Sequence, residues 1–150
     1  MTTPTTLTFT RHLQVSPARV HHALTDPAAR MVWGPPDTDS VVVIEDQPTP
    51  AEGGRETSRC GPKDNPYVTV QTDWLVLTDD RVAYAETLVA EGAHLGITLA
   101  TCDLAASSTG TDLTLTLQIV SYVGDEMIAE FEGGWTHAVD NLGAYVTRSP

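Results

Sequence analysis

Apolar residues recur at helical spacing along Asp125–Arg148 and predict one long amphipathic helix. Asp125 and Glu126 occupy its first turn and Arg148 its last, where the helix dipole favours anions and cations respectively. At about 100° per residue, one arc of this helix holds Met127, Ile128, Phe131, Trp135, Ala138, Val139, Leu142, Tyr145 and Val146.

Near the N-terminus, residues 7–15 alternate between apolar and polar side chains, which predicts a half-buried strand. Arg11 falls on the apolar side of this strand. One interpretation is an edge arginine whose stem packs while its charged head reaches water. The other is a cation that lines a cavity. The first is the commoner behaviour of long charged side chains.

Two short helices follow, because the pairs Ser16-Pro17 and Asp26-Pro27 each combine a good N-cap with a proline at the first helical position. The second helix runs towards Trp33 and ends at the Gly34-Pro35-Pro36 breaker. The two helices are expected to form a V-shaped pair.

The middle of the chain reads as strands separated mostly by short turns. The predicted strands span residues 40–46, 54–60, 67–77, 81–90, 93–104 and 111–123, and residues 105–110 are expected to form a small polar loop. Short connections between successive strands indicate an antiparallel meander. The terminal helix is the only predicted element long enough to cover its apolar face. We therefore predict an α+β domain over residues 1–150, with a curved antiparallel sheet in the order β-α-α-β6-α wrapped around a long C-terminal helix.

The composition of the chain limits the kinds of partner that the protein is expected to bind. The chain has 150 residues and a net charge of −12, which disfavours nucleic acid and anionic membrane surfaces because both need a basic footprint. No apolar run approaches the roughly 18 residues of a membrane span. The two cysteines, Cys60 and Cys102, show no framework spacing, and no signal peptide is evident, so we expect a reduced, cytoplasmic protein. Metal-ligand and phosphate-loop motifs are absent, so we predict no metal and no cofactor.

Several stretches resemble one family. They are Arg11 with Val15-Ser16-Pro17-Ala18-Arg19-Val20, Ala23-Leu24-Thr25-Asp26-Pro27 with Trp33, Gly53-Gly54-Arg55, Asp80-Arg81-Val82 with Tyr84, Gly110-Thr111 with Leu113, and Gly134-Trp135 with Leu142. In order and spacing the chain resembles the START-like (SRPBCC) helix-grip superfamily, and within it the branch of homologues of the heat-shock-chaperone ATPase activator. The resemblance implies a cavity between sheet and long helix, but no shared catalytic signature. Many relatives carry a tryptophan two residues after the mid-sheet aromatic, where this chain has Glu86.

A helix-grip cavity would use large rings and a position with little side chain. The candidate ligand-binding residues are Trp33, Trp74, Tyr84, Phe131, Gly134 and Trp135. Plain core packing is the alternative for each ring. For the pair Gly133-Gly134, each glycine costs about 1 kcal/mol in a helix relative to alanine. Close packing on the sheet, room for a ligand, or a bend that shapes the cavity mouth would each explain that cost.

Three polar residues are candidates for catalysis: Glu86, His94 and Arg11. If the face of Glu86 points inward, its carboxyl lies in an apolar setting with a raised pKa and could act as an acid or base. If that face points outward, Glu86 is a solvated glutamate. His94 shares a register with Gly96, Thr98 and Ala100, and could be a general base.

Three functions are compatible with these patterns. The first is a protein that binds a small hydrophobic or amphipathic molecule. The second, drawn from the family resemblance, is an enzyme like the polyketide cyclases or dehydratases. The third, from the same resemblance, is a chaperone-activator-like interaction module. A homodimer is compatible with the sequence.

Overall fold

The computed structural model describes residues 4–148 and contains one seven-stranded antiparallel sheet and three helices. In chain order the elements are β1 (Thr5–Leu13), α1 (Pro17–Thr25), α2 (Pro27–Trp33), β2 (Ser40–Ile44), β3 (Arg55–Pro62), β4 (Val68–Thr78), β5 (Arg81–Ala90), β6 (Ala93–Ser107), β7 (Gly110–Ser121) and α3 (Asp125–Arg148). The spatial order of strands is β1-β7-β6-β5-β4-β3-β2, so a meander from β2 to β7 is completed by β1 at its far edge.

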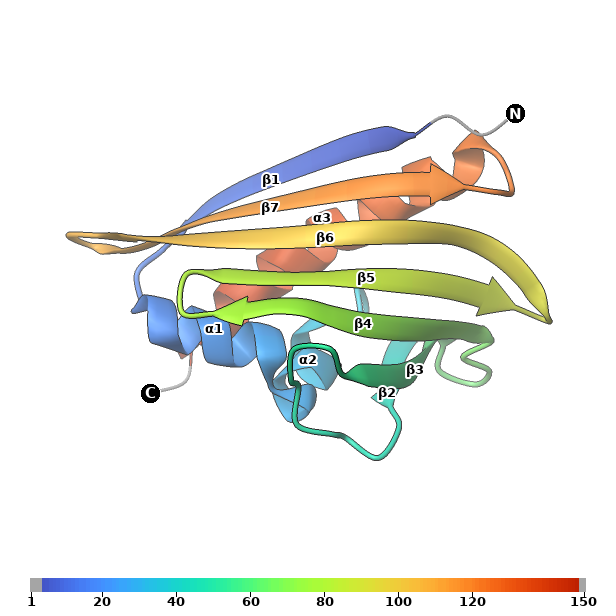
Figure 1. Ribbon diagram of the computed structural model, residues 1–150, viewed down its shortest axis with the longest axis horizontal. Helices are drawn as coiled ribbons and strands as arrows, with labels where there is room; N and C mark the ends of the chain where they lie inside the picture. Colours follow the sequence, from blue (N-terminus) through green and yellow to red (C-terminus); the bar gives the residue numbers. More distant parts are fainter. Residues whose placement is uncertain (1–3, 149–150) are drawn as a thin grey trace.

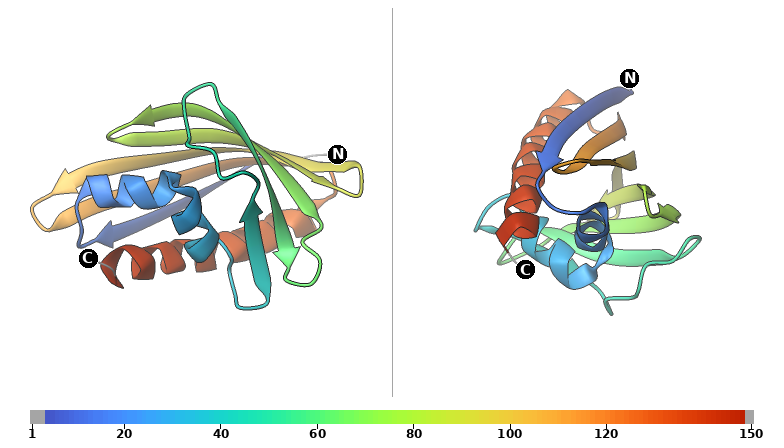
Figure 2. Two further views of the ribbon diagram at one scale, coloured as in Figure 1. Left: turned by 90° about the horizontal axis from the view of Figure 1, so that it is seen from below. Right: turned by 90° about the vertical axis from the view of Figure 1, so that its left-hand side faces the viewer.

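The sheet curls into a half-barrel, and all three helices lie on its concave side (Figure 1, Figure 2). The long helix α3 packs against β1, β7, α1 and α2. This is the predicted α+β helix-grip fold, and the predicted bounds of α3 agree with those observed.

The two short helices form as their caps predict. The Ser16 hydroxyl accepts a hydrogen bond from the Arg19 backbone N–H at 3.3 Å, and the Asp26 carboxylate accepts one from Ala29 at 3.0 Å. The indole N–H of Trp33 donates to the carbonyl of Ala23 at 2.8 Å. That bond ties the end of α2 back to α1 and fixes the angle of the pair.

The loop predicted at residues 105–110 is wrong. Residues 105–107 continue β6, Ser108 and Thr109 make a tight turn, and β7 begins at Gly110. Gly110 has φ of 148° and lies against the carbonyl of Leu13, so a side chain there would meet both strain and a clash. The small polar composition of this stretch reflects an exposed hairpin tip rather than irregular structure.

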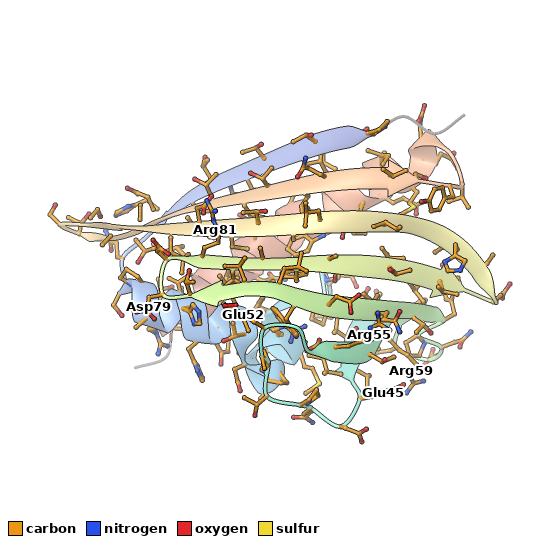
Figure 3. All side chains as sticks on the ribbon, in the orientation of Figure 1. Glu45, Glu52, Arg55, Arg59, Asp79 and Arg81 are labelled. Carbon is orange, nitrogen blue, oxygen red and sulfur yellow. The ribbon has the colours of Figure 1, made fainter. Side chains whose placement is uncertain are left out.

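The convex face of the sheet carries exposed ion pairs, labelled in part in Figure 3, and a few exposed apolar side chains such as Ile97 and Leu99. Arg55 pairs with Asp73 across β3 and β4, and Arg81 pairs with Asp103 across β5 and β6, each at 2.7 Å. These pairs are solvated, so they add little stability. The described residues contain no helix that is long and apolar enough to cross a membrane.

The concave face holds the core, and the strand register divides it into rows that run across the sheet. One row is aromatic and aliphatic: Trp74, Tyr84, Ala100 and Leu117 lie opposite one another on β4, β5, β6 and β7. The next row is Glu56, Thr72, Glu86 and Thr98, on β3 to β6. We call these four residues the polar row. It separates the aromatic row from a third row that contains Val70 and Leu88.

Candidate functional site

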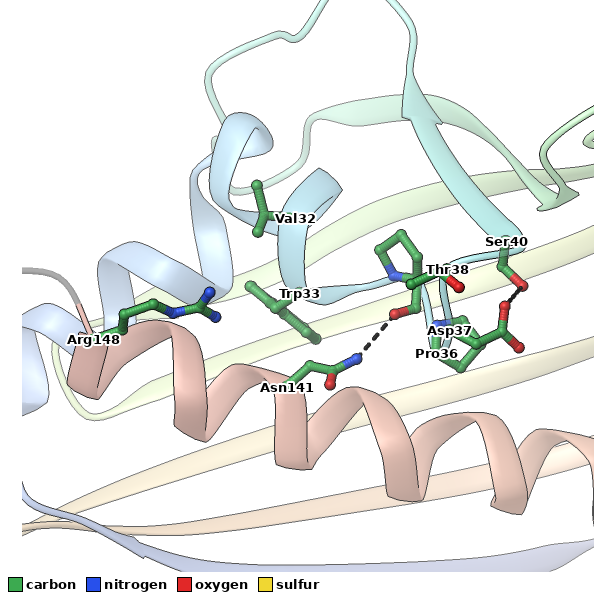
Figure 4. Close-up of a pocket in the computed structure, with 9 residues that line it drawn as sticks. Val32, Trp33, Pro36, Asp37, Thr38, Ser40, Asn141 and Arg148 are labelled. Carbon is green, nitrogen blue, oxygen red and sulfur yellow. Dashed lines mark hydrogen bonds between the residues drawn. The ribbon is translucent and has the colours of Figure 1, made fainter.

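An open pocket of about 520 Å³ lies between the α2–β2 connection and α3 (Figure 4). Its lining is mixed: Val32, Trp33, Pro35, Pro36, Asp37, Thr38, Ser40, Asn141 and Arg148. The Asn141 side-chain amide donates to the Pro35 carbonyl at 3.0 Å and so ties the connection to α3. Of the predicted ligand-binding residues, Trp33 alone lines this pocket.

Trp33 also links this pocket to the interior. Its ring lies 6.5 Å from the ring of Trp135 on α3, centroid to centroid. Trp33 is 6% exposed and belongs to the main apolar core, whereas Trp135 is only partly buried and packs against that core. Trp33 and Trp135, both predicted to bind a ligand, are therefore neighbours at the boundary between the apolar core and this pocket.

The first half of α3, residues 125–135, is loosely covered. Phe131, Gly134 and Trp135 are each half-buried, and Ile128 and Phe131 reach only the margin of the core. A Cβ added at Gly134 would meet no atom within 4 Å, and the same holds at Gly133. Close packing therefore does not explain the glycine pair. The geometry favours the alternative, in which Gly134 leaves open space.

Trp74 and Tyr84 are the two predicted residues on the sheet. They are opposite each other on β4 and β5, and their rings meet edge to face with centroids 5.2 Å apart. Trp74 is 2% exposed, and its indole N–H is buried without a hydrogen-bond partner among the described residues. An unpaired buried donor costs about 1–3 kcal/mol. A tryptophan that serves only to pack the core would usually have its indole N–H hydrogen-bonded.

Beside these rings the polar row places carboxyl and hydroxyl groups on the concave face. Glu56, Thr72 and Thr98 are almost fully buried, and Glu86 is half-buried. The Thr98 hydroxyl donates to Glu86 at 3.1 Å. Glu86 therefore points inward, which selects the first of its two predicted settings.

A buried ion pair anchors the row to the helices. The Arg30 guanidinium on α2 binds both carboxylate oxygens of Glu56, at 2.9 Å and 2.5 Å. The same guanidinium lies over the Trp74 ring, 5.0 Å from its centroid. Arg30 thus joins α2, β3 and β4 at one point, and its charge is already satisfied by Glu56.

The electrostatics of the site follow from this burial. Desolvation raises the pKa of the Glu86 carboxyl, while the Thr98 hydrogen bond and the Arg30 charge oppose that rise and Glu56 adds to it. Burial likewise raises the pKa of Tyr84 well above its usual value. Glu86 consequently has more neutral character than a solvated glutamate and can donate a proton as well as accept one.

The two cysteines are poor nucleophiles. Both thiols are free, as the sequence predicts. Burial is the main cause that raises the pKa of Cys60 to about 11 and that of Cys102 to about 12. A thiolate is the reactive form, so neither side chain is suited to covalent catalysis near neutral pH.

Arg11 lies elsewhere. Its guanidinium pairs with Asp140 of α3 at 3.1 Å and joins β1 to the helix. The β6 residue in its row is Leu104, six positions from Thr98 in the polar row, which corresponds to about 20 Å along the strand. The partly exposed head matches the first interpretation, although Arg11 also borders an open surface pocket of about 330 Å³ with His12 and Asp112, away from the polar row.

His94 also departs from the site. A bulge after Leu88 shifts the register, so Gly96 lies opposite Leu88 but His94 lies opposite Val89. The prediction that His94 shares the face of Thr98 is therefore wrong, and the side chain is exposed. The structure does not bring Arg11, Glu86 and His94 together; Glu86 alone faces the interior.

Arg30 and Glu56 were missing from the sequence prediction. The strand pattern held a partial signal, because Glu56 shares the side of Cys60, a residue type that is commonly buried. No local pattern shows that Arg30, on a helix 26 positions earlier, reaches it. Another contact between distant segments joins the His12 ring to Asp112 at 2.7 Å and to Thr109 at 2.9 Å. It lies on the exposed surface, where water competes for the same hydrogen bonds. Among the described residues no cluster of side chains is suited to hold a metal ion.

Comparison with known proteins agrees with this architecture. The model of the family described as "Activator of Hsp90 ATPase homolog 1-like protein" matches residues 14–147. Protein CV1439 from Chromobacterium violaceum is similar in structure, with 25% identity, a TM-score of 0.80, and coverage of 94% of this chain and 96% of that one. Mll3558 from Rhizobium loti gives 25% identity, a TM-score of 0.80, and coverage of 97% and 99%.

DynU16, from the dynemicin biosynthetic locus, shares the fold at 14% identity and a TM-score of 0.66. The match covers 95% of this chain and 47% of DynU16. No curated protein matches the sequence.

Proposed function

Starting from the fact that the chain belongs to the family of activator of Hsp90 ATPase homolog 1-like proteins, we propose that it binds a small apolar or amphipathic molecule between the sheet and the first half of α3. One observation carries this proposal. Apolar side chains that face the sheet from residues 125–135 are left half-buried, and Gly134 borders open space.

The first half of α3 carries apolar side chains that the fold buries only in part. Ile128, Phe131 and Trp135 continue the apolar stripe of α3, yet the fold itself does not complete their cover. Each Å² of apolar surface removed from water contributes about 25 cal/mol. A ligand that fills the space beside Gly134 would gain this energy without first displacing a packed side chain.

A neutral fluorescent dye, N-phenyl-1-naphthylamine, tests the proposal, because its emission rises on transfer from water to an apolar site. The wild-type protein should bind it saturably. Gly134→Phe places a ring in the open space and should abolish binding. Gly133→Phe is the matched control, because position 133 is exposed and points about 100° away from position 134 around the helix axis.

Circular dichroism should show that both variants keep their helix and sheet content. Saturable binding that survives equally in both variants would move the site away from Gly134. A wild-type protein that binds no dye and no other apolar probe would refute the proposal.

Glu86 favours a second candidate, a cyclase- or dehydratase-like enzyme. An inward carboxyl whose pKa is raised by burial can act as an acid or a base. DynU16 shares the fold and comes from a biosynthetic locus. If polyketide-like substrates are turned over, Glu86→Gln should abolish turnover and leave ligand affinity largely intact; unchanged turnover would exclude Glu86 as the acid or base. The chaperone-activator alternative rests on the family description alone.

A further inference from the structure

The open pocket between the α2–β2 connection and α3 is lined by an arginine that has no acidic partner. Acidic residues outnumber basic ones by 20 to 8 in this chain, so carboxylates are plentiful. Arg148 nevertheless makes no ion pair or hydrogen bond with a described residue. Figure 4 shows its side chain directed back along α3 towards Trp33. Arginines elsewhere in the fold do pair with a carboxylate: Arg11, Arg30, Arg55, Arg59 and Arg81.

A carboxylate, that of Asp37, lies at the other end of this pocket. One of its oxygens accepts hydrogen bonds from the Ser40 hydroxyl at 2.8 Å and from the Asp39 backbone N–H at 2.9 Å, which fixes its orientation. The second oxygen has no partner among the described residues. Figure 4 shows Asp37 and Arg148 on opposite sides of Asn141. Two opposite charges therefore border one pocket without pairing with each other.

Between these charges the lining is apolar. Val32 is 61% exposed, more than any other large apolar side chain of the described residues. The indole N–H of Trp33 is already bonded to the Ala23 carbonyl, so only the ring is left for a ligand. Pro35 and Pro36 have no backbone N–H to offer. A polar group in this stretch would lose water without gaining a donor from these residues, so an apolar segment fits it better.

The helix sets the distance between the two ends. Asn141 and Arg148 are two turns apart, so they lie on the same side of α3 and about 10 Å apart along its axis. The Asn141 side-chain amide holds the Pro35 carbonyl at 3.0 Å, and Asp37 follows two residues later. An α-amino acid carries both charges on one carbon atom and is too short to reach both ends.

We propose that this pocket binds an elongated zwitterion, whose carboxylate pairs with Arg148 and whose ammonium group pairs with Asp37. An apolar chain joins the two charges and crosses Val32 and Trp33. Both ion pairs form at exposed ends of the pocket, so binding buries no charge deeply. This site is separate from the space beside Gly134 and does not depend on the proposed function.

A series of straight-chain probes tests the length and the charges by NMR titration of isotope-labelled protein. The ω-amino acids 4-aminobutanoate, 6-aminohexanoate, 8-aminooctanoate and 10-aminodecanoate vary the separation of the charges, and octanoate and octylamine keep one charge each. The backbone amides of Thr38, Ser40 and Asn141 should shift saturably. Binding should be tightest for 8-aminooctanoate, whose extended chain matches the span. It should exceed that of octanoate and octylamine about two- to fivefold, as expected for one exposed ion pair.

Two exposed side chains can be changed without disturbing the core. Arg148→Gln should weaken binding of 8-aminooctanoate about two- to fivefold and leave that of octylamine unchanged. Asp37→Asn keeps an oxygen for its two hydrogen bonds, and should weaken 8-aminooctanoate by a similar factor while leaving octanoate no weaker. Arg81→Gln and Asp103→Asn are the matched controls, because they make the same changes in net charge on the convex face. Both should leave the affinity for 8-aminooctanoate unchanged.

Several results would overturn this assignment. They are pocket amides that respond to none of the ω-amino acids, equal affinity at all four lengths, and octanoate that binds as tightly as 8-aminooctanoate. A loss in Arg81→Gln as large as that in Arg148→Gln would also overturn it, because net charge rather than the pocket would then attract the carboxylate. Added 8-aminooctanoate should not displace N-phenyl-1-naphthylamine. Displacement would move the zwitterion to the dye site and refute a separate pocket, whereas a failure to bind the dye bears only on the proposed function.

Discussion

The two halves of α3 carry the same apolar stripe but meet different surroundings. In residues 136–148, the stripe residues Ala138, Val139, Leu142 and Val146 are buried, and Tyr145 is partly buried. In residues 125–135, no residue is fully buried and Gly134 borders open space. The second half completes the core. The first half presents apolar surface that the fold leaves unfinished.

This difference shows that one amphipathic period can serve both packing and recognition. Periodicity states which side of a helix faces the sheet, but not how closely the sheet meets it. Side chains and carbonyls of the second half contact β1, α1 and the α2–β2 connection: Asp140 pairs with Arg11, the Val146 carbonyl accepts from Arg19, and Asn141 donates to Pro35. Three of the four predictions that follow test whether the contrast between the halves is energetic as well as geometric, and the other tests the polar row.

The largest effect is expected in the second half. Leu142 is 2% exposed, and Leu142→Ala should lower the free energy of unfolding by about 2–5 kcal/mol, since it deletes a packed side chain and leaves a cavity. Phe131→Ala in the first half should cost about 1–2 kcal/mol, because its ring is only half-buried. Urea unfolding measures both, and equal losses would contradict the contrast.

A gain of stability is expected at the glycine pair. Gly134→Ala and Gly133→Ala should each raise the free energy of unfolding by about 1 kcal/mol, because alanine is a better helix former and its Cβ meets no atom within 4 Å. Thermal unfolding of the two variants provides the comparison. A loss of stability in Gly134→Ala alone would show that the sheet packs against this position after all.

The polar row should make stability depend on pH. The pKa of Glu86 is raised in the folded state, chiefly by burial, so folding favours the protonated form. The stability that this group contributes is present below its unfolded pKa of about 4.3 and is lost as pH rises through the higher folded value. The stability of Glu86→Gln relative to wild type should therefore increase from pH 4 to pH 8. Urea titrations at several pH values would show the trend. A constant difference would mean that folding does not shift the pKa of Glu86, and a decreasing difference would mean that folding lowers it.

The smallest effect is expected at the surface of the second half. Asp140→Ala removes the partner of Arg11, an ion pair with 33% and 62% of the two side chains exposed. Exposed pairs contribute about 0.2–1 kcal/mol, so the loss should lie in that range and shrink in high salt. Unfolding curves at low and high salt measure it. A loss as large as that of Leu142→Ala would assign Arg11 a role beyond holding α3 to β1.

The fold was largely predictable because its signals are local. The cap-proline pairs predicted the two short helices, and the alternation of apolar and polar residues predicted the strands. The apolar stripe predicted α3 with the bounds that are observed. The hairpin at residues 105–110 was the exception. Small residues there have little packing signature, and only pairing between β6 and β7 keeps them extended.

The site was harder to predict because it depends on register and on contacts between distant segments. The alternation in β5 places Glu86 with Tyr84, but sequence alone does not say which side faces inward. His94 changes sides through a single bulge. The partnership of Arg30 with Glu56 joins a helix to a strand, and the open space beside Gly134 is a property of the assembled molecule.

The position of β1 has a consequence for how the chain acquires its structure. Thr5 pairs with Ile119, so β1, the first strand in the sequence, pairs only with β7, the last one. It can therefore join the sheet only once β7 is available. The hairpin of β4 and β5 needs only adjacent residues. Loop closure makes distant pairing slow, so refolding should protect the β4–β5 amides from hydrogen exchange before those of β1. Pulse labelling can establish this order, and simultaneous protection would contradict it. Until β1 arrives, the edge of β7 is an unpaired strand available to other chains.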